Sequence, residues 1–467
     1  MLIGIACLAV FAIMAALMYT RRISALLALP LMAILMAVMG GIPPAAILSD
    51  VISKGAIKLH SAYTTTMFGA VLAELMNKQG IAKALIRWVA EFAGDNPFIL
   101  GAVMTLVTAV LFSTLGGLGA VIMVGTIVLP ALLSLGISSI TAGALFLFGI
   151  SLGGMFNIAG WSLYMTVLDL APSQIINFVV PFALIIGVII LVFLAIELRD
   201  RKNIKYLAVM LAAIGLLFLR QSQGAAVTMS GKTTEVDATS VIAAGCVLLA
   251  LIAYAGFRHA KASLSTPAAA LITPVIPLVL VLFFRWDFIS AFIAGITYGV
   301  LTTWKANSIT VLTRSILDGI TAVIPAVVLM IGIGMLMNAV MAPQVASSIA
   351  PLLKEVIPSR PLPYIITFTL AAPLALYRGP LSLWGMGSGL VQLIKDMRVL
   401  PFPAIMAMLM SVGQVQGICD PTNTANIWIA TYLGTDTQTL LRKTFVYAYI
   451  AVIVGLTMAV QFGYLQK

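Results

Sequence analysis

The stretch FSTLGGLG, residues 112–119, interrupts an apolar run that covers residues 96–135. Each half of this run is too short to cross a bilayer comfortably, because a helix needs about 20 apolar residues to span the hydrocarbon core. The glycines at its centre favour a turn over one continuous helix. Broken backbone at membrane depth is tolerated only where it is buried in protein or lines a cavity. The sequence therefore predicts a re-entrant hairpin over 96–135.

The composition predicts an all-α polytopic membrane protein. Of the 467 residues, 62% are hydrophobic and 9% are charged, whereas a soluble domain has about 25% charged residues. The apolar runs are continuous and do not alternate, which favours helices over transmembrane β-strands. The net charge of +11 fits Lys and Arg in cytoplasmic loops, so no nucleic-acid partner is expected. We expect a multi-pass protein of a bacterial-type inner membrane, with the lipid bilayer as its surroundings and residues 2–19 as a retained first helix.

A hairpin followed by an interrupted helix occurs twice, which predicts an internal repeat. Leu-Met-Asn closes an apolar run at Leu75–Asn77 and again at Leu336–Asn338, and Gly116 in the first hairpin matches Gly379 in the second at an offset of 263 residues. Weak internal symmetry of this kind is typical of carriers. We expect the first repeat at residues 1–200, with its hairpin at 96–135 and its broken helix at 139–170. A linker with two helices follows at 201–266. The second repeat is expected at 267–467, with its hairpin at 363–396 and its broken helix at 402–434.

The basic residues predict that the two repeats are inverted. We place Arg21 and Arg22 in the cytoplasm and count the membrane crossings from there. Each repeat crosses the membrane five times and the linker adds two helices, so the second repeat begins on the side of the membrane opposite to the first. The first hairpin then enters from the cytoplasm and the second from outside. Lys395 and Arg398 are exceptions to the positive-inside pattern, because this count places them on the outer side of the membrane. The basic groups that fall inside are Arg199–Lys205, Arg258/Lys261, Lys305/Arg314 and Arg442/Lys443.

Two opposed hairpins and two interrupted helices resemble the ion transporter superfamily of secondary anion carriers, which includes citrate, C4-dicarboxylate and gluconate-type permeases. The resemblance is one of arrangement and covers about residues 24–200 and 267–464. FSTLGGLG and LYRGPLSLWGMG (376–387) stand where the family has its hairpin tips. GISLGGMFNIAGW (149–161) and GICDPTNTANIW (417–428) stand where it has its broken-helix loops.

This resemblance implies an elevator-like carrier, a homodimer, driven by H⁺ or Na⁺ and without another cofactor. The family's dicarboxylate carriers have Ser-Asn-Thr at both hairpin tips. This sequence has Thr-Asn-Thr at 422–424 instead, so the resemblance leaves open both the coupling ion and the exact substrate.

Half-helices that end at membrane depth expose backbone N–H groups, and their positive dipole ends favour an anion. Glycines at these ends let the chain turn and let a ligand approach the backbone. Neutral polar side chains in the same breaks either bind the substrate or satisfy freed backbone groups. The candidate substrate-binding residues of these two kinds are Gly116, Gly117, Gly379, Ser113, Thr114, Asn157, Asn423, Thr424 and Asn426.

Arg378 is the sharpest single candidate for binding a substrate carboxylate. It lies between two apolar half-helices, where a cation is costly and usually functional. Its planar fork matches a carboxylate with two parallel hydrogen bonds. The other interpretation is that Arg378 extends to the outer interface or pairs with an acid of the protein.

Asp420 is the candidate for ion coupling, together with Thr422. It precedes Pro421 in the second broken helix, where a carboxylate with nearby carbonyl oxygens binds Na⁺ or takes up a proton. A helix cap is an equally good explanation, because Asp is common at the start of a helix.

The sequence contains no motif of an enzyme or an ATP-driven pump. It has two histidines, His60 and His259, far apart, and neither HExxH nor a Walker A loop. We therefore expect a non-enzymatic secondary transporter of a small carboxylate. The alternatives are a gluconate-type sugar-acid permease, favoured by FGAVL at residues 68–72, an uncoupled anion channel, and a membrane-embedded enzyme or complex subunit.

Overall fold

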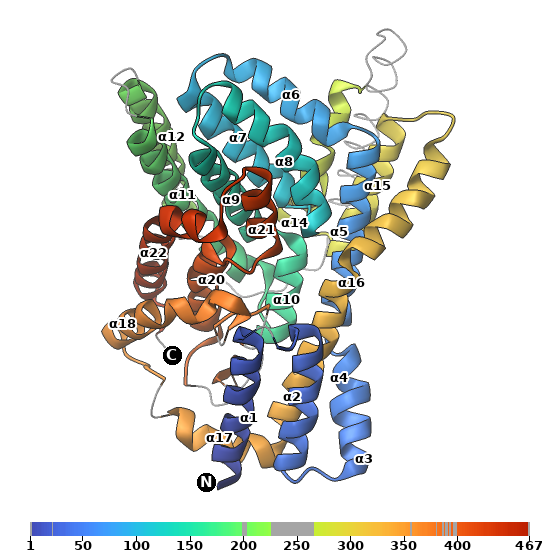
Figure 1. Ribbon diagram of the computed structural model, residues 1–467, viewed down its shortest axis with the longest axis vertical. Coiled ribbons are helices and arrows are strands. Elements are labelled where there is room, and N and C mark those ends of the chain that lie inside the picture. Colours follow the sequence, from blue (N-terminus) through green and yellow to red (C-terminus); the bar gives the residue numbers. More distant parts are fainter. Residues whose placement is uncertain are drawn as a thin grey trace.

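The computed structural model describes residues 2–20, 22–198, 203–225, 266–354, 357–379, 381–384, 387, 391, 394–395 and 399–465. Every regular element within these residues is a helix (Figure 1). The elements of the first half are α1 (Leu2–Tyr19), α2 (Ala25–Met39), α3 (Pro44–Ala46), the π-helix η1 (Ile47–Ser53), α4 (Lys54–Ile57), α5 (His60–Lys78), α6 (Ile81–Ala93), α7 (Pro97–Phe112), α8 (Gly117–Ser134), α9 (Ser139–Met155), α10 (Ile158–Leu168), α11 (Pro172–Glu197) and α12 (Asn203–Ala225).

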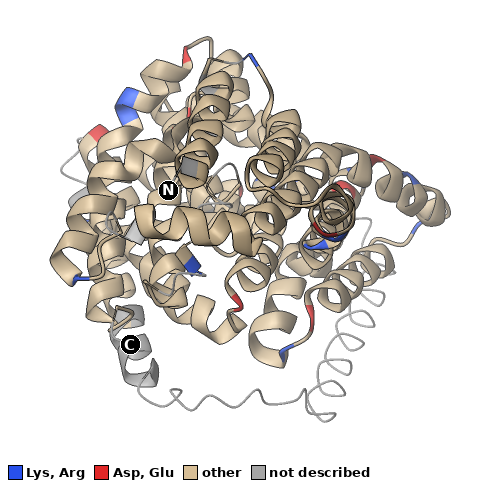
Figure 2. Ribbon diagram, turned by 90° about the horizontal axis from the view of Figure 1, so that it is seen from below, with Lys and Arg blue, Asp and Glu red and all other residues tan. Residues whose placement is uncertain are grey.

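The second half has the same character. Its elements are the 3₁₀-helix η2 (Ala268–Val275), α14 (Ile276–Phe284), α15 (Phe288–Thr302), α16 (Ser308–Met341), α17 (Pro343–Lys354), α18 (Pro361–Ala371), the 3₁₀-helix η3 (Ala372–Arg378), α20 (Phe402–Cys419), α21 (Thr424–Tyr432) and α22 (Thr437–Gln461). Figure 2 shows how sparse Lys, Arg, Asp and Glu are among the helices.

Five of the described helices are long and apolar enough to cross a membrane, or six when the bent pair α9–α10 counts as one span. Several others are apolar but shorter, with 10–17 residues. The prediction of an all-helical, multi-pass membrane protein is confirmed. The second of the two linker helices expected within 201–266 lies outside the described residues.

The longest helix, α16, packs along α5, α4 and α2 (Figure 1). Small residues permit the close approach: a Cβ on Gly334 would lie 2.2 Å from the carbonyl oxygen of Gly55, and one on Gly319 would lie 2.7 Å from that of Ala70. Small residues are used in this way where membrane helices touch.

Residues 44–57 form a helical column of α3, η1 and α4 that packs on α2 and α16. Helix α16 begins at Ser308, so Arg314, one of the basic residues expected on the cytoplasmic side, belongs to a helix and not to a loop. This position is compatible with its charge, because Arg314 is exposed. Four residues further along α16, Asp318 pairs with Lys78 of α5.

The other group of helices contains the interrupted ones. Helix α7 packs on α9, α9 packs on α20, and α20 packs on α22. An aromatic cluster joins α9, α11 and α22, because the Phe193 ring lies 5.1 Å from that of Phe148 and 5.0 Å from that of Tyr447. Segments from both halves of the chain therefore share one core.

Candidate functional site

The two interrupted helices cross just before their breaks. Ser151 Oγ on α9 donates a hydrogen bond to Gln414 Oε1 on α20 at 2.8 Å. A Cβ on Gly417 would lie 3.0 Å from the same Ser151 oxygen, so the two backbones come close. Ser151 and Gln414 are 263 residues apart, the offset that also relates Gly116 to Gly379. The breaks of α9–α10 and α20–α21 therefore lie beside each other.

The first break is tied to the first hairpin by Asn157. The chain bends by 49° between α9 and α10, and Asn157 Oδ1 caps α10 by accepting from Gly160 N at 3.2 Å. Its Nδ2 donates to the carbonyl oxygens of Phe112 at 3.2 Å and Leu115 at 3.1 Å. One amide thus closes a helix start and holds the tip of the hairpin against it.

The two hydroxyls of the first tip are used within the protein. Ser113 Oγ donates to the Val110 carbonyl at 2.7 Å, and Thr114 Oγ1 donates to that of Leu111 at 3.2 Å. Both residues are buried. The Ser113 hydroxyl thereby helps to satisfy the carbonyls at the end of α7, whereas the Leu111 carbonyl also accepts from the amides of Thr114 and Leu115.

The backbone at the start of α8 faces open space. Gly116 is the N-cap residue, and no side chain caps the helix. Residues 116–119 are exposed, and a Cβ on Gly116 or Gly119 would meet no heavy atom within 4 Å. Gly117 has a φ of +80°, which a glycine adopts without strain. The first N–H groups of α8 are therefore uncapped by any side chain, at the positive end of its dipole.

Asp420 ties the second break to the second hairpin and is almost completely buried, with 1% of its surface exposed. Its Oδ1 accepts from Thr422 N at 2.9 Å and from Thr422 Oγ1 at 2.6 Å. Its Oδ2 accepts from Tyr377 N at 3.0 Å. Tyr377 has a φ of +57°, so its amide is presented at a turn. The carboxylate therefore occupies the place in the second repeat that Asn157 occupies in the first.

An unsatisfied acceptor lies in the same break. Asn423 Oδ1 caps α21 by accepting from Ala425 N at 3.2 Å, while Thr424 is exposed. Asn426 is fully buried, and its Nδ2 donates to the Ile418 carbonyl at 2.9 Å. Its Oδ1 has no hydrogen-bond partner. Because buried polar atoms are nearly always paired, this oxygen needs a donor or a cation.

The second tip is closed where the first is open. Gly379 is buried, and a Cβ there would lie 2.2 Å from the Leu374 carbonyl oxygen, so the turn admits only glycine. Ser382 Oγ donates to Gln416 Oε1 on α20 at 2.8 Å. Arg378 ends η3, but its side chain lies outside the described part of the structure. Its expected role in binding a carboxylate stays a prediction.

Sequence reasoning missed several contacts around the site. Ser151 lies in the quoted stretch 149–161 but was not singled out, and Gln414 and Gln416 belong to no motif. All three are recognised only because helices distant in sequence cross there. Lys395, an exception in the crossing count, forms an ion pair with Asp169 and donates to the Val167 carbonyl at 3.0 Å. It thereby joins the second hairpin to α10. Among the described residues, no group of three or more His, Cys, Asp and Glu could hold a metal ion.

Comparisons with known proteins give one structural likeness to report. No protein family and no curated protein matches the sequence. The fold is similar to that of the YdaH transporter from Alcanivorax borkumensis, a crystal structure described as having an unusual topology, with 15% identity, 88% of each chain covered and a TM-score of 0.48. At this identity and TM-score, the likeness carries no conclusion about what this chain does.

Proposed function

We propose that the protein is a secondary active transporter of a small organic anion, a carboxylate, driven by a proton or sodium gradient. The observation that carries the proposal is the crossing of α9 and α20 at Ser151 and Gln414, just before both helices break. Discontinuous helices that meet between two repeats are where carriers bind substrate and coupling ion. No soluble function explains two broken helices inside an apolar bundle, because broken backbone in a membrane must line a cavity or be buried.

The start of α8 is the anion-binding part of this site. Asn157 bonds to the carbonyl of Leu115, which directly precedes Gly116, so the uncapped helix start lies beside the first break. The exposed glycines leave room for a carboxylate against the backbone N–H groups. Asn423 and Thr424 at the start of α21, and Arg378 at the end of η3, are the further substrate contacts of the proposal.

The coupling ion belongs to the second break in this proposal. The buried Asp420 carboxylate and the unsatisfied Asn426 Oδ1 belong to the same interruption of the chain. A sodium ion would satisfy this oxygen by coordination, and a proton would neutralise the carboxylate. Thr422 already donates its hydroxyl to Asp420 and holds the carboxylate in place.

Elevator-like movement is the mechanism that fits the packing. Helices α2, α4 and α5 each pack along α16, whereas α7, α9, α20 and α22 form a second group around the breaks. In the proposal the first group is the stationary scaffold, and the second carries the site across an inner membrane. The protein would act as a homodimer of inverted repeats.

A thermal-shift screen followed by transport assays tests this function. Purified protein is heated with a panel of mono-, di- and tricarboxylates and sugar acids, with and without sodium, because a ligand of the folded state raises the melting temperature. The best ligand is then offered to proteoliposomes under a sodium or a proton gradient. We expect accumulation against the ligand's own gradient. Flux that never exceeds equilibrium would identify a channel and contradict the proposal.

A further inference from the structure

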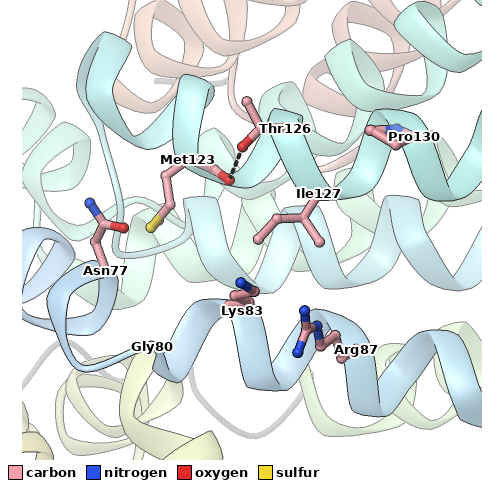
Figure 3. A pocket seen from close by; sticks show the side chains of 8 residues that line it. All are labelled: Asn77, Gly80, Lys83, Arg87, Met123, Thr126, Ile127 and Pro130. Atoms are coloured by element: carbon pink, nitrogen blue, oxygen red, sulfur yellow. Dashed lines mark hydrogen bonds between the residues drawn. The ribbon is translucent and has the colours of Figure 1, made fainter.

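A polar cavity lies away from the broken helices. It has a volume of about 530 Å³ and is formed by the end of α5, by α6 and by α8. Figure 3 shows Lys83 and Arg87 of α6 on one side and Met123, Thr126 and Ile127 of α8 on the other. None of its eight lining residues belongs to the hairpin tips or to the breaks of α9–α10 and α20–α21. The cavity is therefore distinct from the site described above.

The charge of this cavity is positive, and no described residue balances it through an ion pair. Lys83 and Arg87 are one helical turn apart, and both point into the cavity from the same face of α6 (Figure 3). None of the eight lining residues is acidic. No ion pair joins either cation to a carboxylate of a described residue. Asn77, at the end of α5, adds a neutral amide.

The opposite wall is apolar, and α6 has the character of a helix at a membrane surface. Met123, Ile127 and Pro130 of α8 form that wall. Ile81, Ile86 and Val89 of α6 are buried, while Trp88 is 58% exposed. An amphipathic helix with basic residues and an exposed Trp is typical of the bilayer interface. The crossing count places this end of α5 in the cytoplasm.

We propose that this cavity binds the phosphate headgroup of an anionic phospholipid, with Lys83 and Arg87 on the phosphate and the start of an acyl chain along Met123 and Ile127. Basic pockets between membrane helices on the cytoplasmic side bind lipid headgroups in this way. A free phosphate or carboxylate would use the cations but would leave the apolar wall without a partner. The wall therefore favours the lipid as the source of the anion.

A bound lipid would hold α6 against α8. Helix α6 follows directly after α5, which packs on α16, whereas α8 is the second helix of the first hairpin. Helix α6 already packs on α7 and on α8, so the headgroup would reinforce the contact between α6 and the first hairpin. This inference does not depend on which substrate the protein carries, and it is tested by binding alone.

Native mass spectrometry tests the proposal. The full chain is stripped of lipid in detergent and then titrated with phosphatidylglycerol or with phosphatidylcholine. We expect phosphatidylglycerol to bind more tightly, and Lys83→Gln/Arg87→Gln to weaken it roughly 30-fold, from about fivefold for each charge near an anionic headgroup. The matched control is Lys305→Gln/Arg314→Gln, which removes two exposed cations expected on the same membrane face and should leave the affinity unchanged.

A second variant separates loss of the site from loss of the fold. Ile127→Trp keeps both cations and fills the cavity, so it should also weaken phosphatidylglycerol binding while the melting temperature stays within a few degrees of the wild type. Equal phosphatidylglycerol affinity in all variants would overturn the proposal. So would an effect of the pocket variants on glycerol phosphate binding without an effect on phosphatidylglycerol, because the ligand would then be a soluble anion.

Discussion

Asn157 and Asp420 occupy corresponding places in the two halves of the chain, 263 residues apart. The amide of Asn157 donates to carbonyls of the first tip, and the carboxylate of Asp420 accepts from an amide of the second. In both halves one side chain ties the break of a helix to a hairpin tip, but the hydrogen bonds run in opposite directions. This difference explains why an acid is present in one repeat and a neutral amide in the other.

Asp420→Asn should destabilise the protein and impair uptake. The Asn side chain presents an NH₂ group either to Thr422 or to the Tyr377 amide, so a donor meets a donor at a buried position. Leaving one such group unpaired costs about 1–3 kcal/mol. A lower melting temperature in detergent, together with reduced accumulation in proteoliposomes, is the expected result. Thr422→Val removes a single hydroxyl donor and serves as a milder control. A melting temperature equal to that of the wild type would contradict this role of Asp420.

Gly119→Ala tests the open start of α8. A Cβ there meets no heavy atom of the protein, and alanine is favoured over glycine in a helix by roughly 0.5–1 kcal/mol. Folding should therefore be unaffected or slightly improved. If a carboxylate lies against these N–H groups, the methyl group takes its space, and the apparent KM should rise at least about tenfold, from a loss of about 1.4 kcal/mol of binding free energy. Gly215→Ala in α12, which also meets no neighbouring atom, is the matched control and should transport normally.

At the scale of elements, α16 depends on glycine where it passes α4. A Cβ on Gly334 would overlap the Gly55 carbonyl oxygen, which is backbone and has no rotamer to change. Gly334→Ala should push the two helices apart at a cost of about 1–3 kcal/mol. The melting temperature should fall, while the Gly215→Ala control stays at the wild-type value. An unchanged melting temperature would show that the contact between α16 and α4 accommodates the added methyl group without loss of stability.

The first turn of α22 should make stability depend on pH. Asp436 caps this helix, and donation by the Thr439 hydroxyl and amide holds the pKa of its carboxyl below the ordinary value. Such a group stabilises the fold above the unfolded-state pKa, and the contribution is lost as pH falls through the lowered folded-state pKa. The difference in melting temperature between wild type and Asp436→Ala should therefore shrink on acidification. A difference that stays constant across this pH range would contradict the interpretation.

The elements show how far the sequence could be interpreted without the structure. Breaks could be predicted because Gly, Pro and Asn interrupt apolar runs locally, and the helix ends at residues 112 and 419 follow from this. The start of α16 at Ser308 could not, because Arg314, which was counted with the cytoplasmic loops, lies on an exposed part of the helix. The pairing of Lys395 with Asp169 spans 226 residues and follows from packing, which no local pattern reveals.

Within the site, the sequence identified the residue types but not their partners. For Ser113 and Thr114 the sequence left open whether they bind the substrate or satisfy freed backbone groups, and their hydroxyls donate to carbonyls of their own helix. Asn157 and Asn423 both serve as helix caps, which was the alternative explanation for them. The exposure of the first tip and the burial of the second depend on how whole helices pack, and the sequence contains no signal for either.

At the scale of the whole molecule, the two hairpin tips differ although the sequence pattern makes them equivalent. Residues 116–119 are exposed, whereas Gly379, Leu381 and Ser382 are buried. An inverted repeat that alternates between two states exchanges the environments of its halves. On the proposed transport mechanism, we expect the structure to represent one state, and we expect its counterpart to bury the first tip and expose the second.

Cysteine labelling from the two sides of the membrane tests this exchange. In a chain whose native cysteines, Cys7, Cys246 and Cys419, have been replaced, Leu118→Cys and Ser382→Cys are treated with a membrane-impermeant maleimide in oriented proteoliposomes. We expect Leu118→Cys, which is exposed in this state, to react rapidly from the cytoplasmic side. Ser382→Cys, which is buried, should react slowly and only from the outside, because it must wait for the opposite state. A saturating substrate that favours one state should slow one reaction and accelerate the other. Labelling of both positions from the cytoplasm alone would contradict the inverted arrangement, since no exchange of the tips could then place the second hairpin on the outer side.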